Sequence, residues 1–508
     1  MKKKKRGFTL VELLAVIVIL AVILVIAVPR IMSVIKDAKL GSIESTAKII
    51  ASTAESRYES KKALGLDVGD LKCTDVASLS NDYGKCKITF DDNGVATVIV
   101  NGKKDGKFDN LACQGTKDNM TCTEGEISTS RKCTTTDTLV DNLKFVDGQY
   151  TYTYNSSSQG WSVVLTDKES TDPVTTELCG TINDKPIVSM HEMFYNSKAK
   201  SIDLSSFDTS KVTDMNLMFR GSTATSLDLS SFDTSNVTNM LHMFFGSAAT
   251  EIKGLKNFDT SKVTDMSCMF CESKLTSLDL SNFDTSKVTS MESMFWESAA
   301  TEIKGLKNFD TSKVTYMGGM FWSSAATSLD LSNFDTSNVT DMSSMFSGSK
   351  ATSLDLSSFD TSNVTKMDDM FESSAATEIK GLENFNTSKV TDMERMFSRS
   401  AATSLNLSSF DTSNVTSMRE MFSWSAATTL DLSSFNTSNV TNMDEMFAFS
   451  AATILDLSSF DISKLEDNDI SGMFLESAVT TAYVRTQEDA DRFNEEWTDP
   501  LPFVVKSQ

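Results

Sequence analysis

Histidine and proline are scarce in this chain, and catalytic glycine-rich motifs are missing. Of 508 residues, five are prolines and two are histidines, His191 and His242. Two histidines are a poor supply for general acid–base catalysis or for a zinc site. The sequence also has no Gly-x-Ser-x-Gly element and no glycine-rich phosphate loop. We therefore expect that the protein is not an enzyme and that it holds no cofactor and no metal.

Positive charge is also in deficit. The chain has 47 lysines and arginines against 69 aspartates and glutamates, which gives a formal net charge of -22. Repulsion by this charge argues against nucleic acid or an anionic membrane surface as a partner. The composition, 40% hydrophobic and 23% charged, is typical of folded protein. A chain of this length is too long for one core, so we expect at least two folded bodies.

Long apolar runs are absent except near the amino end. Residues 8–28 follow a basic block, residues 2–6, and form an apolar run of about 20 residues, the length of a membrane-spanning helix. The basic block is expected to stay in the cytoplasm. The prediction is a single-pass protein of the cytoplasmic membrane, with its amino end inside and everything after residue 28 outside. A general secretory signal fits less well, because the run is too long and no small-x-small cleavage site follows it.

Residues 7–14 (GFTLVELL) closely resemble the leader of type IV prepilins and pseudopilins. The resemblance covers roughly residues 1–60. It implies cleavage between Gly7 and Phe8 by a prepilin peptidase, methylation of the new amino group of Phe8, and assembly with other pilin subunits. Pro29 matches the proline that bends pilin helices. On this basis residues 1–7 are a leader and residues 8–64 a transmembrane and assembly helix.

Glu12 is the unusual residue of the apolar run. A carboxylate at this depth costs about 2.5–3.5 kcal/mol on insertion scales, and a simple anchor has no reason to keep it. The ammonium that cleavage creates on Phe8 of a neighbouring subunit could pair with Glu12 inside a helical bundle. The alternative is an incidental glutamate in an uncleaved signal anchor.

Residues 65–148 form a small cysteine-rich β region by pattern. Two short β-type runs flank residues 91–94 (DDNG), a typical hairpin turn. An even number of cysteines in an exported segment favours disulfides. Sequence alone does not choose among the possible connectivities; pairing of neighbours is our working prediction, and a metal site is the alternative. The pairs would be Cys73–Cys86, Cys113–Cys122 and Cys133–Cys179.

Residues 188–480 repeat a unit of 25 or 26 residues that ends in Met-Phe. In the unit that ends at Phe244, Leu227 and Leu229 alternate with polar residues, as in a short half-buried strand. Val237, Met240 and Met243, with Phe244, have the spacing of one helix face. The predicted fold is therefore an α/β leucine-rich-repeat-like solenoid with one short strand and one helix in each unit. Residues 149–187 and 481–508 are expected to cap its two ends.

The recurrent Leu-Asp-Leu-Ser-x-Phe-Asp-Thr-Ser-x-Val-Thr-x-Met-x-x-Met-Phe also resembles the BspA-like leucine-rich-repeat surface proteins of bacteria. This resemblance covers about residues 150–508 and implies a cell-surface solenoid that adheres to host or partner proteins. A pilin-type amino end is a departure from that family.

The middle residue of each predicted strand is the best candidate for a binding face, since it points away from the core. A solvated face without a ligand is the alternative. The row consists of Asp203, Asp228, Lys253, Asp279, Lys304, Asp330, Asp355, Lys380, Asn406, Asp431 and Asp456. Aromatic residues after Met-Phe are a second set of possible contacts: Phe245, Trp296, Trp322, Trp424 and Phe449.

The methionines and cysteines of the repeats can be explained without metal binding or a redox reaction. The recurrent methionines form regular columns, which indicates core packing and not a copper site. Cys268 and Cys271 occur in one unit only and are treated as an incidental pair, with a redox pair or a local disulfide as alternatives.

The sequence thus predicts a type IV pilin-like subunit, a minor pilin, that displays an adhesive solenoid on the bacterial surface. Its partners would be the prepilin peptidase, other pilins and an extracellular protein or glycan. The alternative is a membrane-anchored receptor with an uncleaved signal anchor that never polymerises.

Overall fold

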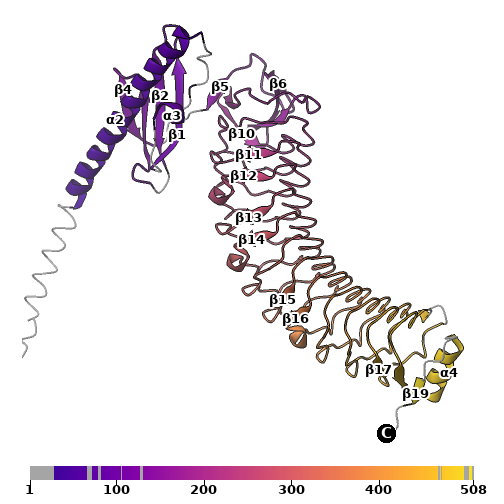
Figure 1. Ribbon diagram of the computed structural model, residues 1–508. Helices are drawn as coiled ribbons and strands as arrows, with labels where there is room; N and C mark the ends of the chain where they lie inside the picture. The colour runs from indigo at the N-terminus through magenta and orange to yellow at the C-terminus, as the bar shows by residue number, and fades with distance from the viewer. Residues whose placement is uncertain are drawn as a thin grey trace, which may run out of the picture. The chain divides into compact units, whose positions relative to one another are not determined.

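The computed structural model of the chain describes residues 28–65, 71, 73–77, 82–103, 106–125, 130–466, 469–470, 472–496 and 503–505. The chain divides into two compact units, Met1–Thr129 and Ser130–Gln508. Figure 1 draws the first in indigo and purple, and the second from purple through orange to yellow. Each unit has its own cluster of buried apolar residues.

The first unit is a long helix packed on an antiparallel sheet. Its strands, in the order β1-β2-β3-β4, are β1 (Tyr83–Phe90), β2 (Ala96–Gly102), β3 (Leu111–Gly115) and β4 (Met120–Glu124). Helix α2 spans Val28–Ala63, and a short helix, α3 (Cys73–Val76), precedes β1. Ile43, Ala47 and Ile50 of α2 are fully buried. Their helical spacing places them on one face, which packs against alternate residues of β2.

The predicted pilin helix over residues 8–64 is described only from Val28 to Ala63, so the structure does not show a helix of full pilin length. Gly7, Phe8 and Glu12 lie outside the described residues, and so does the chain before Val28, on which a bend at Pro29 depends. Among the helices that are described, none has the length and apolar character that crossing a bilayer requires.

The cysteines of the predicted disulfide set are paired as neighbours. The bonds are Cys73–Cys86, Cys113–Cys122 and Cys133–Cys179. The first two lie in the first unit, and the third joins strands of the second. Cys268 and Cys271, which the sequence left as an incidental pair, also form a disulfide.

The second unit begins with a six-stranded sheet in the order β5-β9-β10-β8-β7-β6. The strands are β5 (Arg131–Cys133), β6 (Lys144–Asp147), β7 (Tyr150–Asn155), β8 (Gly160–Leu165), β9 (Cys179–Ile182) and β10 (Lys185–Ser189). Trp161 is fully buried beneath it, and its indole N–H donates to the carbonyl of Ile182 at 3.2 Å. The sheet thus covers the first coil of the solenoid that follows.

The repeats form a β-solenoid whose coils are stacked in chain order (Figure 1). The predicted strand column is present, and its three-residue strands pair in parallel between adjacent coils. They are β11 (Ser226–Asp228), β12 (Glu251–Lys253), β13 (Ser277–Asp279), β14 (Glu302–Lys304), β15 (Ser353–Asp355) and β16 (Glu378–Lys380), followed by β17 (Ile454–Leu457), β18 (Thr481–Val484) and β19 (Phe503–Val505). Single 3₁₀ turns follow three of them: η2 (Leu255–Asn257), η3 (Leu306–Asn308) and η4 (Leu382–Asn384).

The helix predicted in each repeat is wrong for the described coils. Where it was expected, the Met-x-x-Met-Phe segment makes consecutive turns, with one residue between the methionines at positive φ, such as Leu217 at 59°. Alternate amides bond within the coil, as Met218 does to Met215, while those between them bond to the next coil. Leu217, for example, donates to Leu241 at 3.0 Å. In an α-helix these amide groups would bond to carbonyls of the same segment. In the turns, half of them bond to carbonyls of the next coil instead.

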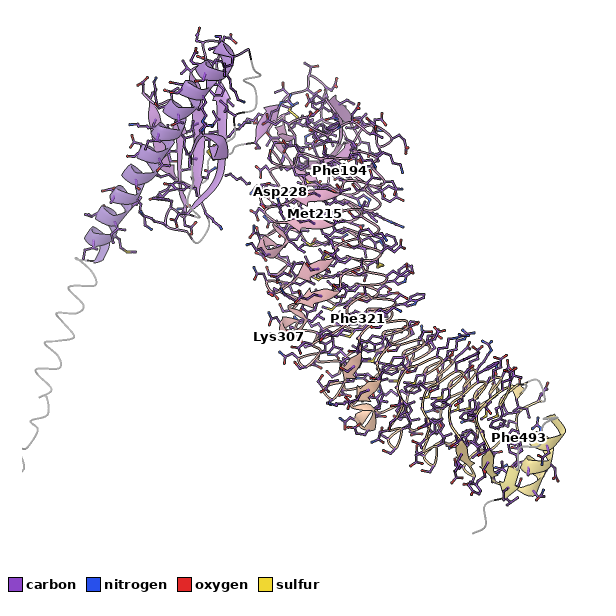
Figure 2. All side chains as sticks on the ribbon, in the orientation of Figure 1. Phe194, Met215, Asp228, Lys307, Phe321 and Phe493 are labelled. Atoms are coloured by element: carbon purple, nitrogen blue, oxygen red, sulfur yellow. A yellow bond between two sulfur atoms is a disulfide. The ribbon has the colours of Figure 1, made fainter. Side chains whose placement is uncertain are left out.

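The core of the solenoid consists of columns of equivalent residues. The Met-Phe phenylalanines stack face to face from coil to coil, as Phe321 does on Phe346 with ring centroids 5.8 Å apart. Both repeat methionines are fully buried, which confirms that they pack the core. In Figure 2, Phe194, Met215 and Phe321 lie within the stack, whereas Asp228 and Lys307 lie at its edge.

The two ends of the stack are closed by side chains that reach exposed carbonyls. At the first coil, Lys168 Nζ donates to the carbonyl of Glu192 at 2.9 Å. At the last, Arg492 on helix α4 (Gln487–Glu496) donates to the carbonyls of Ile462 and Leu465. Phe493 of the same helix covers the end of the phenylalanine column by an edge contact with Phe474. Terminal coils lack a neighbour on one side, and these contacts cap the two ends of the stack.

Candidate binding surfaces of the solenoid

The predicted row of strand-centre residues, here called the strand row, is at the surface. Every member except the half-buried Asp456 is exposed. The aspartates are engaged, however: Asp279 Oδ1 accepts the backbone N–H of Ser281 at 3.2 Å and its hydroxyl at 2.7 Å. These bonds lower the pKa of Asp279, with a further contribution from Lys304 opposite. The strand row therefore holds turns together, and its neighbouring charges of opposite sign offset one another.

A shallow hollow of about 630 Å³ lies on the strand row beside β12. Its floor is formed by Gly254, whose positive φ of 85° begins the 3₁₀ turn η2. A side chain there would clash, since a Cβ would come within 2.4 Å of the backbone nitrogen of Ser230. The lining includes Glu251, Lys253 and Asp279 but no aromatic ring, so it offers little to hold a ligand beyond exposed charge.

A second surface is formed by the outward side chains of the Met-x-x-Met-Phe segments, here called the turn row. In its first half aromatic residues contact one another across coils. Arg220 lies over the rings of Tyr195 and Phe245, at 5.7 and 4.5 Å. Trp296 contacts Phe245 edge-on and stacks on Trp322, with centroids 6.3 and 5.3 Å apart. The aromatic residues noted in the sequence are thus brought together here, with the further pair Trp424 and Phe449 stacked at 4.1 Å.

The disulfide Cys268–Cys271 lies within this aromatic part of the turn row. Cys271 occupies the position that Phe245 and Trp296 have in the two adjacent coils. A disulfide at this point restrains the turn that separates the two rings. The third disulfide bears on metal binding: Cys133, Cys179 and Asp147 lie close together, but the two cysteines are bonded to each other and offer no thiolate.

A hollow of about 380 Å³ adjoins Trp322, and we call it the Trp322 hollow. Its walls come from three consecutive coils. Tyr316 and Trp322 are 51% and 40% exposed, and Gly318 and Gly319 form the floor between them. Its other lining residues are Glu292, Ser293, Asp341, Ser343 and Ser344. Aromatic faces combined with a few convergent polar groups are the usual make-up of a small-ligand site.

The second half of the turn row is charged. Arg395 and Arg419 lie between acidic residues of adjacent coils: Arg395 contacts Glu420 at 3.0 Å, and Arg419 contacts Glu394 at 2.9 Å. Arg419 also pairs with Glu420 and, at 3.7 Å, with Asp444. We call this set the ion ladder. Asp369 lies one coil before Arg395. Burial raises the pKa of Asp369 to about 6, and the charge of Glu372 adds to the effect.

Buried polar atoms without a hydrogen-bond partner concentrate on the turn row. Seven such side-chain atoms occur in the described part of the chain. Four belong to residues of the turn row: His191 Nδ1, Asn216 Oδ1, Trp296 Nε1 and Asp369 Oδ1. Native proteins satisfy nearly all buried polar groups, so these four atoms are sites where water or a ligand would supply the missing partner.

Sequence reasoning missed the Trp322 hollow. It named Trp322 but not Tyr316, Gly318, Gly319, Glu292 or Asp341. The available signal was local: Tyr316 and the two glycines depart from the repeat, and they fall in one coil with Trp322.

By its fold, the protein is a capped β-solenoid of short repeats, joined to a separate unit that carries an amino-terminal helix. The repeats then identify the family. A family described as Mycoplasma protein of unknown function, DUF285, matches residues 172–269, 244–326, 297–379 and 372–485. These matches together cover more than half of the chain, which therefore belongs to that family.

A second family match concerns the amino end. A prokaryotic N-terminal methylation motif matches residues 2–28. It supports the type IV pilin-like segment and implies processing by a prepilin peptidase and assembly with other pilins. The resemblance to BspA-like proteins is not established by these matches. No curated protein and no solved structure matches the chain.

Proposed function

We propose that the protein is a minor type IV pilin that carries its solenoid to the bacterial surface as an adhesive domain. The observation that carries this proposal is the match of residues 2–28 to the methylation motif. Such a motif is processed at the cytoplasmic membrane, which residues 8–28 would cross before assembly. The proposal assigns no catalytic step and no cofactor to the chain.

The adhesive part of the proposal rests on the solenoid. A stack of similar coils offers an extended surface in which core columns are constant and outward positions are free to vary. The turn row uses this freedom for exposed aromatic residues, such as Trp322 and Trp424, and aromatic side chains are enriched among the strongest contacts of protein interfaces. The BspA-like resemblance of the repeats points to the same role on a cell surface.

Glu12 and Phe8 provide the assembly mechanism. Cleavage after Gly7 frees the amino group of Phe8, and we propose that this ammonium pairs with Glu12 of an adjacent subunit within the helical bundle. A buried carboxylate without a partner is strongly unfavourable, so the pair would fix the axial register between subunits.

The test is to sequence the amino terminus of the protein isolated from sheared surface filaments. Methylated Phe8 is expected. Recovery of an intact Met1, with the protein in the membrane fraction alone, would instead support the non-polymerised anchored receptor.

Glu12→Val is expected to leave export intact and to reduce the amount of protein in sheared filaments by at least about tenfold, because one unpaired partner of a buried pair costs several kcal/mol. Glu44→Val is the matched control, since it removes a carboxylate that pairs with Lys48 on the described helix α2 at 2.7 Å. Equal filament amounts for the two variants would refute the pairing.

A further inference from the structure

The coil that ends in Phe321 departs from the repeat at three outward positions, Tyr316, Gly318 and Gly319. Nine other coils have Asp, Asn or Ser directly before the first repeat methionine, and its side chain accepts the backbone N–H two residues later. Asp341 does so for Ser343 at 3.0 Å. Tyr316 stands at this position and cannot make that bond. The Phe321 coil therefore gives up a turn-stabilising contact and gains an exposed phenol ring.

Gly318 and Gly319 open the surface beside Tyr316. The next coil has Ser343 and Ser344 at these two positions. A Cβ on Gly318 would lie 3.3 Å from both Asp341 Oδ1 and the Ser343 hydroxyl, and one on Gly319 would lie 2.9 Å from the Ser293 hydroxyl. The glycines thus uncover polar groups of the two neighbouring coils, and this is why the Trp322 hollow exists.

Trp322 closes one side of the hollow with an aromatic face. One face of its indole is stacked on Trp296, with an angle of 19° between the ring planes. The next coil has the buried Ser347 at the equivalent position, so the aromatic stack ends at Trp322. The exposed indole and the exposed Tyr316 ring frame the glycine floor.

The polar groups of the hollow include both donors and acceptors. The carboxylate of Glu292 makes no hydrogen bond or ion pair with the described residues and only a longer-range electrostatic interaction with Lys366, so its oxygens are available as acceptors. The backbone N–H of Gly318, which Tyr316 leaves uncapped, likewise has no acceptor among the described residues. The hydroxyls of Ser293 and Ser344 can act in either sense. Asp341 is balanced by Lys366, whose Nζ lies 3.2 Å from Oδ2.

This combination matches one chemical class best. A pyranose ring has an apolar face of C–H groups and a rim of hydroxyls, each of which donates and accepts. The negative face of an aromatic ring attracts the C–H groups, and ionised carboxylates are the strongest acceptors for hydroxyls. A cationic side chain would need acceptors only and would leave the Gly318 N–H unused. A sialic acid would bring a third carboxylate beside those of Glu292 and Asp341, which share the single cation Lys366.

We propose that the Trp322 hollow is a binding site for a neutral pyranose at the end of an extracellular glycan. Trp322 and Tyr316 hold the sugar ring, Glu292 and Asp341 accept its hydroxyl protons, and the Gly318 N–H donates to a sugar oxygen. The inference rests on the proposed surface function and names the ligand class of that surface. A single site of this size binds weakly, with a dissociation constant of about a millimolar, and repetition along a filament would raise the avidity.

The experiment uses the full-length chain in a detergent without a sugar headgroup. It is first applied to an array of neutral and sialylated oligosaccharides. Binding is then measured by ligand-observed NMR with the methyl glycosides of glucose, galactose, mannose and N-acetylglucosamine, and with a short lysine-containing peptide as the cationic probe. Binding to at least one neutral glycoside is expected, and binding to the cationic peptide or to sialylated glycans alone would overturn the proposal.

Three variants and one control locate the site. Trp322→Ser, Gly318→Ser and Tyr316→Asp each introduce the residue that the next coil or most coils carry, so all three suit the fold. Each is expected to weaken glycoside binding by at least about tenfold, because it removes a ring or fills the floor. Ile454→Ser removes an exposed apolar side chain of β17, outside the hollow, and is expected to change nothing.

Unchanged binding in Trp322→Ser and Gly318→Ser, with thermal unfolding like that of the parent chain, would refute the site. The result is independent of filament assembly. A chain that binds sugar but keeps Met1 would overturn the pilin proposal alone, and a methylated, assembled chain that binds no neutral sugar would overturn this inference alone.

Discussion

The two halves of the turn row share one backbone and differ in chemistry. From Tyr195 to Trp322 the outward residues are aromatic rings in contact with one another and with Arg220. From Asp369 to Asp444 they are mainly acids and arginines, several of them joined in the ion ladder, with Trp424 stacked on Phe449 as a separate aromatic pair. The buried methionine and phenylalanine columns run unchanged beneath both halves.

The core and the surface of each coil are therefore specified separately. Interlocked turns and buried columns set the backbone, so a coil tolerates a tryptophan, a glycine or an arginine at the same outward position. The ion ladder satisfies its own charges among adjacent coils. The aromatic half instead ends in an open hollow, and for this reason the ligand site is assigned to it.

The largest expected effect is the same in both halves. Phe321→Ala in the aromatic half and Phe397→Ala in the charged half each remove a fully buried ring from a column. Each is expected to lower the free energy of unfolding by about 3–5 kcal/mol, because a cavity replaces the ring. Denaturant unfolding of the full chain measures this, with the exposed Thr327→Ala as control. Costs that differ by more than twofold between the halves would show that the coils do not share one core.

Asp369 gives the charged half a pH dependence of stability that the aromatic half is not expected to share. Burial raises its pKa to about 6, above the value of about 3.9 in the unfolded chain. Between these values the folded state binds more protons, so its contribution to stability is present at low pH and is lost as the pH rises to about 6. Asp369→Asn is expected to remove this slope and to raise stability at pH 7 by about 1 kcal/mol, a figure reduced for partial solvent screening.

Asp411 serves as a control, because its pKa is shifted in the opposite direction from that of Asp369. Hydrogen bonds from Ser413 lower the pKa of Asp411, so its contribution is present at neutral pH and is lost as the pH falls. Unfolding curves between pH 4 and 8 would contradict the assignment if Asp369→Asn kept the slope of the parent chain.

The smallest expected effect concerns the ion ladder. Arg419→Met removes contacts to acids of three coils and is expected to cost about 1 kcal/mol at low ionic strength, since partly exposed pairs are weak. The cost is expected to shrink in molar salt, where such charges are screened. Lys304→Met, which removes one exposed pair with Glu302, is expected to have no measurable effect. A cost for Arg419→Met that does not change with salt would mean that packing, and not charge, is lost.

The repeat, the strand column and the buried methionines could be predicted from the sequence, because each recurs with a fixed spacing. The helix in each repeat could not be excluded in this way. Val237, Met240, Met243 and Phe244 have a spacing that a helix face and a run of three-residue turns produce equally well. The choice depends on whether the amides bond within the coil or to the next one, and that information lies between repeats.

For the candidate site too, the sequence indicated one part and only the structure showed the rest. Trp322 was visible in the sequence as an aromatic residue after Met-Phe. Its relation to Glu292 and Asp341 was not, because these residues belong to adjacent coils and meet only when the coils stack. The strand-row aspartates show the reverse case: their exposure was predicted correctly, whereas their use as turn acceptors depends on the local backbone.

The sequence by itself determined the prepilin-type methylation motif at the amino end, the period of the repeats and the identity of the core columns, since these depend on short motifs and on spacing along the chain. Tertiary structure alone decided that the repeats coil without helices and that a hollow opens beside Trp322. The physical reason is that both depend on hydrogen bonds and clearances between residues about 25 positions apart, which become neighbours only through stacking.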